Sequence, residues 1–136
     1  MFRQIFVNLP IKDMARSQAF FKALGLTFNP RFTNEQGACL EIGENFYAML
    51  LVEPFFQGFT KKPIGDAQKT TEVILALSVD SRAEVEEVMR KAVAAGATRP
   101  NEPKDRGFMF QDGFADLDGH QWEVFWMDEA AAPVQM

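Results

Sequence analysis

Histidine and cysteine are almost absent from this sequence of 136 residues, which contains one of each. A single cysteine excludes an intrachain disulfide and fits a reducing compartment. A single histidine excludes metal centres that take two or three imidazoles from one chain, as common zinc hydrolases and two-His-one-carboxylate iron sites do. The sequence therefore restricts metal chemistry before any fold is considered.

Long apolar runs and an excess of positive charge are also missing. No apolar stretch approaches the roughly 20 residues that a membrane-spanning helix needs, and the first residues lack the basic region and cleavage site of a signal peptide. The 14 Lys and Arg residues against 19 Asp and Glu residues leave a net charge of −5, which argues against nucleic acid as a partner. We expect a soluble, cytoplasmic protein with no nucleic-acid or membrane partner.

The pattern that is present begins with a strand that leads into a helix. Residues 5–11 alternate apolar and other side chains at period two, which is typical of a strand with one buried face. Asp13 is a candidate helix N-cap, apolar residues then recur at helical spacing, and Gly25 is placed to end the helix. The order strand, helix, glycine is thus predicted for the first quarter of the chain.

The same order returns in the second half of the chain. Residues 73–79 alternate, Ser81 and Glu84 form a capping box, and an apolar stripe runs through residues 85–93 before Gly96. Each predicted helix is followed by shorter strand-like runs, at residues 26–33, 38–42 and 46–52 in the first half and 108–116 and 121–127 in the second. Residues 98–107 contain two prolines, so a strand there would be short and at an edge.

These elements predict an α+β fold made of two βαβββ modules. We expect one domain over residues 1–128, with the first module at 1–59, a polar connector at 60–71 and the second module at 72–128. Residues 129–136 lack periodicity and are predicted to form a flexible tail.

Several segments of the sequence resemble the vicinal oxygen chelate superfamily, which contains glyoxalases, bleomycin- and fosfomycin-resistance proteins and extradiol dioxygenases. The resemblance covers residues from about 2 to 128, and it is carried by the runs 6–13, 17–21, 24–26 and 116–123, the last being Asp-Leu-Asp-Gly-His-Gln-Trp-Glu. It implies a curved mixed sheet around a cleft, with the helices on the outer face, and a homodimer.

The resemblance also implies four positions at which metal-dependent members carry ligands. They fall on Phe6, on Met49 or Leu50, on Ile74 and on Glu123, and only Glu123 is a ligand type for a divalent cation. We therefore predict no metal cofactor, while a rearranged site that includes Gln4 or His120 stays open as the alternative. His120 lies in a predicted turn, and we expect it to be exposed there.

Strand parity predicts which side chains face away from the helices. That face carries Gln4, Phe6, Asn8, Ile74, Ala76, Ser78, Gln121, Glu123, Phe125 and Met127. Such a mixed surface is typical of a small-molecule pocket and also of an interface between modules. As ligand-binding residues we predict Phe6, Asn8, Tyr47, Met49, Phe55, Phe56, Ile74, Ser78 and Phe125.

Glu123 is the candidate catalytic or anchoring residue. A carboxylate on a central strand needs a partner or a wet cavity, because burying an unpaired charge is costly. Two interpretations stay open: Glu123 faces the cleft and anchors or deprotonates a ligand, or it is paired with Arg or Lys, or hydrogen-bonded to Asn8 or Gln121, without a catalytic task. Cys39 is predicted to be a small core residue, and the Asp116–Gly119 segment a hairpin turn.

The function predicted from these observations is metal-independent binding of a small aromatic or cationic compound, as in resistance proteins of this superfamily. The alternative is an enzyme, a lyase, isomerase or dioxygenase relative, in which Glu123 acts as general base or belongs to a rearranged metal site. A third possibility is that the cavity is vestigial and the protein acts through its surface.

Overall fold

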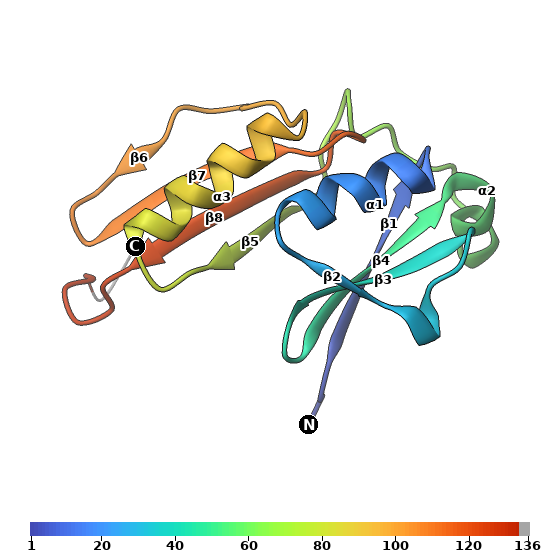
Figure 1. Cartoon of the computed structure of the whole chain (residues 1–136), viewed down its shortest axis with the longest axis horizontal. Helices are drawn as coiled ribbons and strands as arrows, with labels where there is room; N and C mark the ends of the chain where they lie inside the picture. Colours follow the sequence, from blue (N-terminus) through green and yellow to red (C-terminus); the bar gives the residue numbers. More distant parts are fainter. Residues whose placement is uncertain (134–136) are drawn as a thin grey trace. The chain divides into compact units, whose positions relative to one another are not determined.

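The computed structural model describes residues 1–133 and divides into two compact units, Met1–Asp66 and Ala67–Met136. The boundary between them lies inside the stretch 60–71 that the sequence marks as a connector. Each unit contains one four-stranded sheet and one long helix (Figure 1). The assignment of residues 1–128 to a single domain stays a prediction.

The first unit forms the sheet β1-β4-β3-β2, in which β1 runs parallel to β4 and the other neighbours are antiparallel. Its long elements are β1 (Ile5–Ile11), α1 (Met14–Ala23), β2 (Thr27–Asn29), β3 (Gly37–Gly43) and β4 (Phe46–Val52). Its short helical turns are η1 (Pro30–Phe32), α2 (Glu53–Phe56) and η2 (Gln57–Phe59).

The second unit repeats this topology in the sheet β5-β8-β7-β6, with β5 parallel to β8. Its elements are β5 (Ile74–Ser78), α3 (Arg82–Ala94), β6 (Lys104–Asp105), β7 (Met109–Ala115) and β8 (Gln121–Met127). The predicted α+β class and the two βαβββ modules are confirmed. The short edge strand expected within residues 98–107 is β6.

Both long helices begin and end where the sequence places their caps. The Asp13 carboxylate accepts a hydrogen bond of 3.0 Å from the backbone N–H of Arg16, and the Ser81 hydroxyl accepts one of 3.2 Å from the N–H of Glu84. Gly25 and Gly96 follow the helices with φ of 91° and 109°, a conformation that glycine adopts without steric cost.

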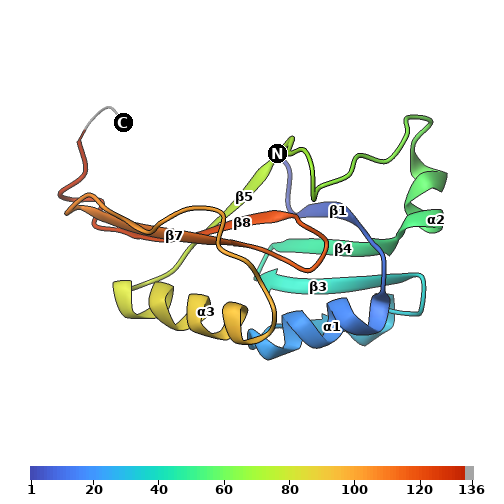
Figure 2. The ribbon, with the colours of Figure 1, turned by 90° about the horizontal axis from the view of Figure 1, so that it is seen from above.

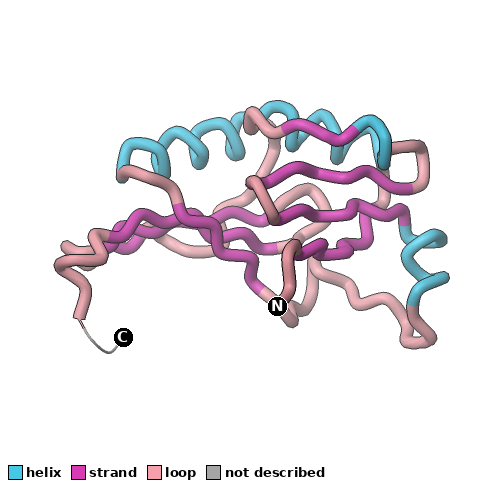
Figure 3. The backbone as a smooth tube through the Cα atoms, turned by 90° about the horizontal axis from the view of Figure 1, so that it is seen from below, coloured by secondary structure: helices cyan, strands magenta, loops and turns pink. Residues whose placement is uncertain are grey.

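Each sheet packs one face against its own helix. Helix α1 contacts β3 and β4, and α3 contacts β7 and β8, as the views in Figures 2 and 3 show for each unit. In the first unit this layer buries Phe20 and Phe21 beside Leu40, Ala48 and Leu50. The corresponding layer of the second unit buries Val85, Met89, Phe114, Trp122 and Val124. The opposite faces of the sheets are therefore the ones available for a site.

Two local features differ from the sequence prediction. The strand expected over residues 26–33 is shorter, because Pro30 begins a 3₁₀ turn whose first N–H, that of Arg31, is capped by the Asn29 side chain at 3.0 Å. No helix was predicted after β4, yet α2 forms there with Pro54 in its first turn, where the missing N–H of proline costs no hydrogen bond.

Among the described residues, no helix combines the length and the apolar character that crossing a lipid bilayer requires. In the predicted tail, residues 129–131 form turns and residues 134–136 lie outside the described part of the chain.

Candidate functional site

In the first unit, the face opposite α1 carries four of the predicted ligand-binding residues. Phe6 pairs with Tyr47 and Asn8 with Met49 across β1 and β4, and paired residues on neighbouring strands share a face. The rings of Phe6 and Tyr47 stack with their centroids 4.7 Å apart and their planes 14° apart. The Gln4 amide donates a hydrogen bond of 3.5 Å to the Tyr47 hydroxyl. These side chains form an aromatic row with polar groups beside it.

The register also decides between Met49 and Leu50. Leu50 is fully buried on the side of α1, where it pairs with Leu9. Met49 is half-buried and lies on the face of Asn8. Of the two residues, only Met49 lies on the face that carries Phe6.

The phenylalanines that follow β4 lie at the other end of this strand from Tyr47. Phe55 and Phe59 contact each other edge to face, with centroids 5.3 Å apart, and Phe56 is half-buried. A Cβ atom at Gly37, which pairs with Leu51, would lie 3.9 Å from Cε2 of Phe55. On β4, Leu51 lies four residues from Tyr47, which is about 13 Å at roughly 3.3 Å per residue. Phe55 therefore lies at the opposite end of this strand from Tyr47.

In the second unit, a pocket of about 240 Å³ opens on the face of the sheet opposite α3. Strands β5 to β8 and the segment before β6 supply its lining, which consists of Ile74, Pro100, Asn101, Glu102, Lys104, Gln111, Asp112, Gly113, Gln121, Trp122 and Glu123. The register places Ile74 beside Gln121, Ala76 beside Glu123, and Ser78 beside Phe125. Among the predicted site residues, Ile74 and Glu123 therefore line the pocket, and Ser78 and Phe125 form the next row on the same face.

Glu123 is half-buried, and its Oε1 accepts a hydrogen bond of 3.1 Å from the Gln111 amide. Among residues 67–133, neither Gln121 nor a Lys or Arg side chain forms a hydrogen bond or ion pair with Glu123. Gly113 lies directly opposite Glu123, and a Cβ atom there would lie 2.8 Å from the Trp122 carbonyl oxygen. The absence of a side chain at Gly113 thus keeps the space beside the carboxylate open.

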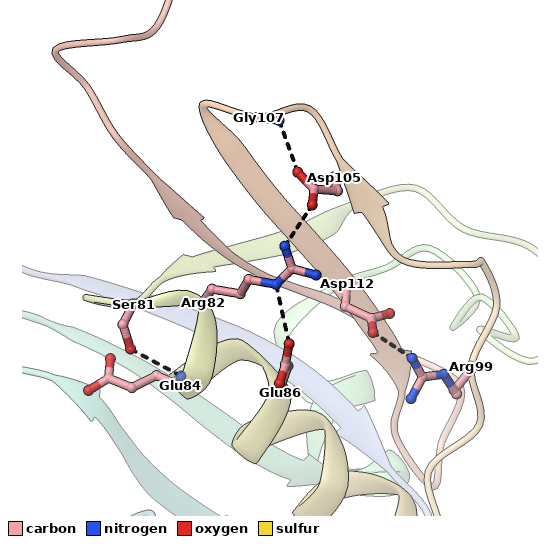
Figure 4. A network of polar contacts seen from close by, with 8 residues as sticks. All are labelled: Ser81, Arg82, Glu84, Glu86, Arg99, Asp105, Gly107 and Asp112. Atoms are coloured by element: carbon pink, nitrogen blue, oxygen red, sulfur yellow. Dashed lines mark hydrogen bonds and ion pairs between the residues drawn. The ribbon is translucent and has the colours of Figure 1, made fainter.

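The segment before β6 is held at both ends by ion pairs (Figure 4). Arg99 and Asp112 lie 2.5 Å apart at one end. At the other end Asp105 lies 2.6 Å from Arg82 and accepts a hydrogen bond of 2.9 Å from the N–H of Gly107. The Gly107 N–H and then Arg82 lower the pKa of Asp105. These contacts fix the wall of the pocket that contains Glu102 and Lys104.

Asp116 organises the turn that joins β7 to β8, and the predicted hairpin turn is confirmed. One carboxylate oxygen accepts hydrogen bonds of 3.0 Å from the N–H groups of Asp118 and His120, and the other accepts one of 3.0 Å from the Trp122 indole. Burial raises the pKa of Asp116. The expectation that His120 is exposed is wrong: it is half-buried, because its backbone is held against the buried Asp116.

Cys39 is confirmed as a core residue, with 1% of its surface exposed. Burial, and secondarily Glu41, raises the pKa of its thiol, so the reactive thiolate is scarce near neutral pH. We expect an aromatic disulfide reagent at pH 8 to react with the folded protein about 100-fold more slowly than with protein in urea, because reaction requires local opening. Equal rates in the two conditions would contradict the placement of Cys39.

The residues at the four positions do not fit the metal site that the resemblance implies. Phe6 and Ile74 offer no lone pair, Met49 offers only a weakly donating thioether, and Glu123 alone carries a suitable oxygen. Within residues 1–133, no three His, Cys, Asp or Glu side chains are grouped so that they could hold a metal ion. We therefore derive no chemistry through a metal.

Sequence reasoning missed Gln111, Gly113 and the wall formed by residues 100–104. A usable signal for the first two was present, because a hairpin centred on Asp118 places Gly113 opposite Glu123 and Gln111 opposite Phe125. The wall has no such signal, since its position depends on the ion pairs of Arg82 and Arg99 with residues distant in sequence.

Comparison with known proteins agrees with this architecture. Residues 3–43 match the family model of the bleomycin resistance protein-like N-terminal region, whereas a search of curated proteins gives no match. The chain is similar to the solved structure of hypothetical protein SA1046 from S. aureus, with 26% identity over 93% of this chain and 95% of that chain and a TM-score of 0.78.

Two further similar structures have described families. A glyoxalase-related enzyme from Fulvimarina pelagi is 23% identical over 92% of this chain and 88% of its own, with a TM-score of 0.77. The fosfomycin resistance protein FosX from Listeria monocytogenes is 19% identical over 100% of this chain and 95% of its own, with a TM-score of 0.67. With its paired βαβββ modules and the match of residues 3–43 to the bleomycin resistance protein-like model, the chain has the fold of solved glyoxalase-related and fosfomycin-resistance proteins.

Proposed function

We propose that this protein binds a small aromatic or cationic compound without a metal ion, as a binding protein of the resistance type. The observation that carries the proposal is the pocket of the second unit, whose lining combines the Glu123 carboxylate with three amide side chains and the apolar side chain of Ile74. Small-molecule sites combine apolar surface with converging polar groups, and in this mostly polar pocket Ile74 and Pro100 supply apolar surface. The volume of about 240 Å³ is below the roughly 300–1,000 Å³ of drug-sized sites, so we infer a small ligand.

The first unit supports the same proposal through its aromatic row. Phe6 is 48% exposed although its ring stacks on Tyr47, so an aromatic surface remains accessible on the face opposite α1. Aromatic faces bind planar rings and cations. We propose Phe6, Asn8, Tyr47 and Met49 as ligand-binding residues of this face.

Replacing Glu123 with glutamine tests the role of the carboxylate. We expect benzylamine, a small aromatic cation, to bind the Glu123→Gln protein about tenfold more weakly than the wild type, because a charge-assisted hydrogen bond is lost. Calorimetric titration at pH 7 measures this change. The matched control is Glu72→Gln, since Glu72 is exposed and lies outside the pocket.

Unchanged affinity together with unchanged stability in Glu123→Gln would contradict the proposed role of this residue. If Glu123→Gln lowers the stability of the protein but not its affinity for benzylamine, the Glu123 carboxylate has only a structural role, as the hydrogen-bond partner of Gln111.

Metal independence is tested by elemental analysis of untagged protein combined with thermal shift measurements. We expect no stoichiometric metal, and a higher melting temperature with small aromatic cations than without them, because a ligand selective for the folded state stabilises it. Stoichiometric metal bound with sub-micromolar affinity would overturn the proposal.

An enzymatic role is the second candidate. Among residues 1–133, the Gln111 amide provides the one hydrogen bond to the Glu123 carboxylate, which leaves acceptor capacity directed at the pocket. A general base needs this capacity, and a lyase, isomerase or dioxygenase relative would use it directly. Turnover that is lost in Glu123→Gln and retained in Glu72→Gln would favour this role.

We also propose that the protein is a cytoplasmic homodimer. The resemblance to dimeric members of the superfamily and the single cysteine support this proposal. Light scattering of the purified chain tests the dimer, and a strict monomer would contradict it.

A further inference from the structure

The pocket of the second unit contains a lysine that the sequence does not single out. Strand β6 pairs with β7 through Lys104 opposite Gln111 and Asp105 opposite Phe110. Alternation along a strand sends these two side chains to opposite faces. Gln111 shares its face with Phe125 and donates a hydrogen bond to Glu123, so the register places Lys104 on the face of the pocket.

The partners of Asp105 fix this orientation independently. Its carboxylate contacts Arg82, the first residue of α3 (Figure 4). Arg82 also lies over the ring of Phe110, with its guanidinium carbon 4.2 Å from the centroid. Asp105 is thus tied to the helix side of the sheet. A shift of β6 by one residue would break these contacts, so Lys104 is held on the opposite side, where it lines the pocket.

Lys104 and Glu123 are separated by a strand. They belong to β6 and β8, the two neighbours of β7, and Glu123 is two residues along β8 from Phe125, which lies level with Lys104. Two strand spacings of about 4.8 Å and an offset of about 7 Å put their backbones roughly 12 Å apart. Within residues 1–133, no carboxylate lies within ion-pair distance of Lys104, including Glu102, which also lines the pocket. The amide of Gln111 lies between the two charges.

We propose that this pocket takes a small ligand with an anionic group and a cationic group at its two ends, the anionic group bound by Lys104 and the cationic group by Glu123. This inference rests on the proposed function and specifies the ligand class for the same pocket. A purely cationic ligand would use the carboxylates of Glu123 and Glu102 and leave Lys104 without a counter-charge. A ligand with both charges satisfies the two ends, while the amides of Gln111 and Gln121 supply donors and acceptors between them.

A matched set of probes separates the two charges. 4-(Aminomethyl)benzoate carries both groups across one ring, 4-methylbenzylamine carries only the cation, and 4-methylbenzoate carries only the anion. We expect calorimetric titration of the wild-type chain to give 4-(aminomethyl)benzoate a Kd about tenfold lower than that of either single-charge probe, since a second charge-assisted contact is gained.

Two variants assign the ends of the ligand. Lys104→Met is expected to remove the advantage of 4-(aminomethyl)benzoate over 4-methylbenzylamine, with the Kd of the amine unchanged within about twofold. Glu123→Gln is expected to remove the advantage over 4-methylbenzoate. Lys61→Met, at an exposed position of the first unit, is the control. Circular dichroism checks that each variant is folded, and Lys104→Gln replaces Lys104→Met if the apolar side chain causes aggregation.

The outcomes distinguish this inference from the proposed function. If the amine binds as tightly as the doubly charged probe, and Lys104→Met changes neither, the proposed function stands and the inference is overturned. Lys104 would then only protect the edge strand from pairing with other chains. If none of the three probes binds the wild-type chain, both the inference and the proposed function fail.

Discussion

Replacing Asp116 with alanine is expected to lower the free energy of unfolding by about 3 kcal/mol, because three N–H donors lose their acceptor and each unsatisfied buried donor costs roughly 1–3 kcal/mol. Two of the donors are the backbone N–H groups of Asp118 and His120, and the third is the indole of Trp122, which is 2% exposed. Water can reach the backbone donors in part, so the indole accounts for most of the loss. Urea unfolding followed by tryptophan fluorescence measures the change.

A mutant cycle isolates the contribution of the indole. Trp122→Phe removes the N–H donor and keeps an aromatic ring, so Asp116→Ala should cost about 1–2 kcal/mol less in that background than in the wild type. The control is Asp128→Ala, at an exposed residue that accepts one hydrogen bond. Equal costs for Asp116→Ala in both backgrounds would show that the indole is not held by this carboxylate.

Leu50→Ala is expected to destabilise the first unit by about 3 kcal/mol, within the roughly 2–5 kcal/mol range of leucine truncations in cores. Leu50 is a fully buried residue of β4, the strand that packs against α1, so its truncation leaves a cavity in the core. Met49→Ala is the matched control, because Met49 is the next residue on the same strand and lies half-buried on the opposite face. Its truncation should cost less than half as much.

The same variant tests whether residues 1–128 unfold as one domain. Both tryptophans lie in the second unit, so tryptophan fluorescence reports that unit while far-ultraviolet circular dichroism reports both. In a single cooperative domain, Leu50→Ala shifts the two transitions equally. A shift in circular dichroism without a shift in fluorescence would contradict the single-domain prediction. A larger loss for Met49→Ala than for Leu50→Ala would reverse the assignment of the sheet faces.

The elements that the sequence predicted best are those specified by local chemistry. Asp13, Ser81, Gly25 and Gly96 mark the ends of the two long helices because capping bonds and positive φ involve residues close in sequence. Strand β8 agrees with its predicted range of 121–127, since its alternation is uninterrupted. The repetition of these signals made the two βαβββ modules recognisable.

The site was harder to predict because it depends on contacts between residues far apart in sequence. Glu123 was singled out, but its partner Gln111 lies on a neighbouring strand, and parity alone did not assign that strand. Lys104 looked like an ordinary charged residue in a proline-containing segment. Its orientation follows from Arg82 and Asp105, 23 residues apart, a contact that periodicity does not reveal.

The central position of β8 has a consequence for how the second unit is made during translation. Strand β5 is synthesised first, yet its neighbour in the sheet is β8, the last strand. A nascent chain that has reached only Asp116 therefore has a β5 without a hydrogen-bonded partner and an Asp116 without its indole donor. Ribosome-bound or prematurely terminated chains of this length are expected to be protease-sensitive in the second unit, and protection should arise only after Met127 has left the exit tunnel.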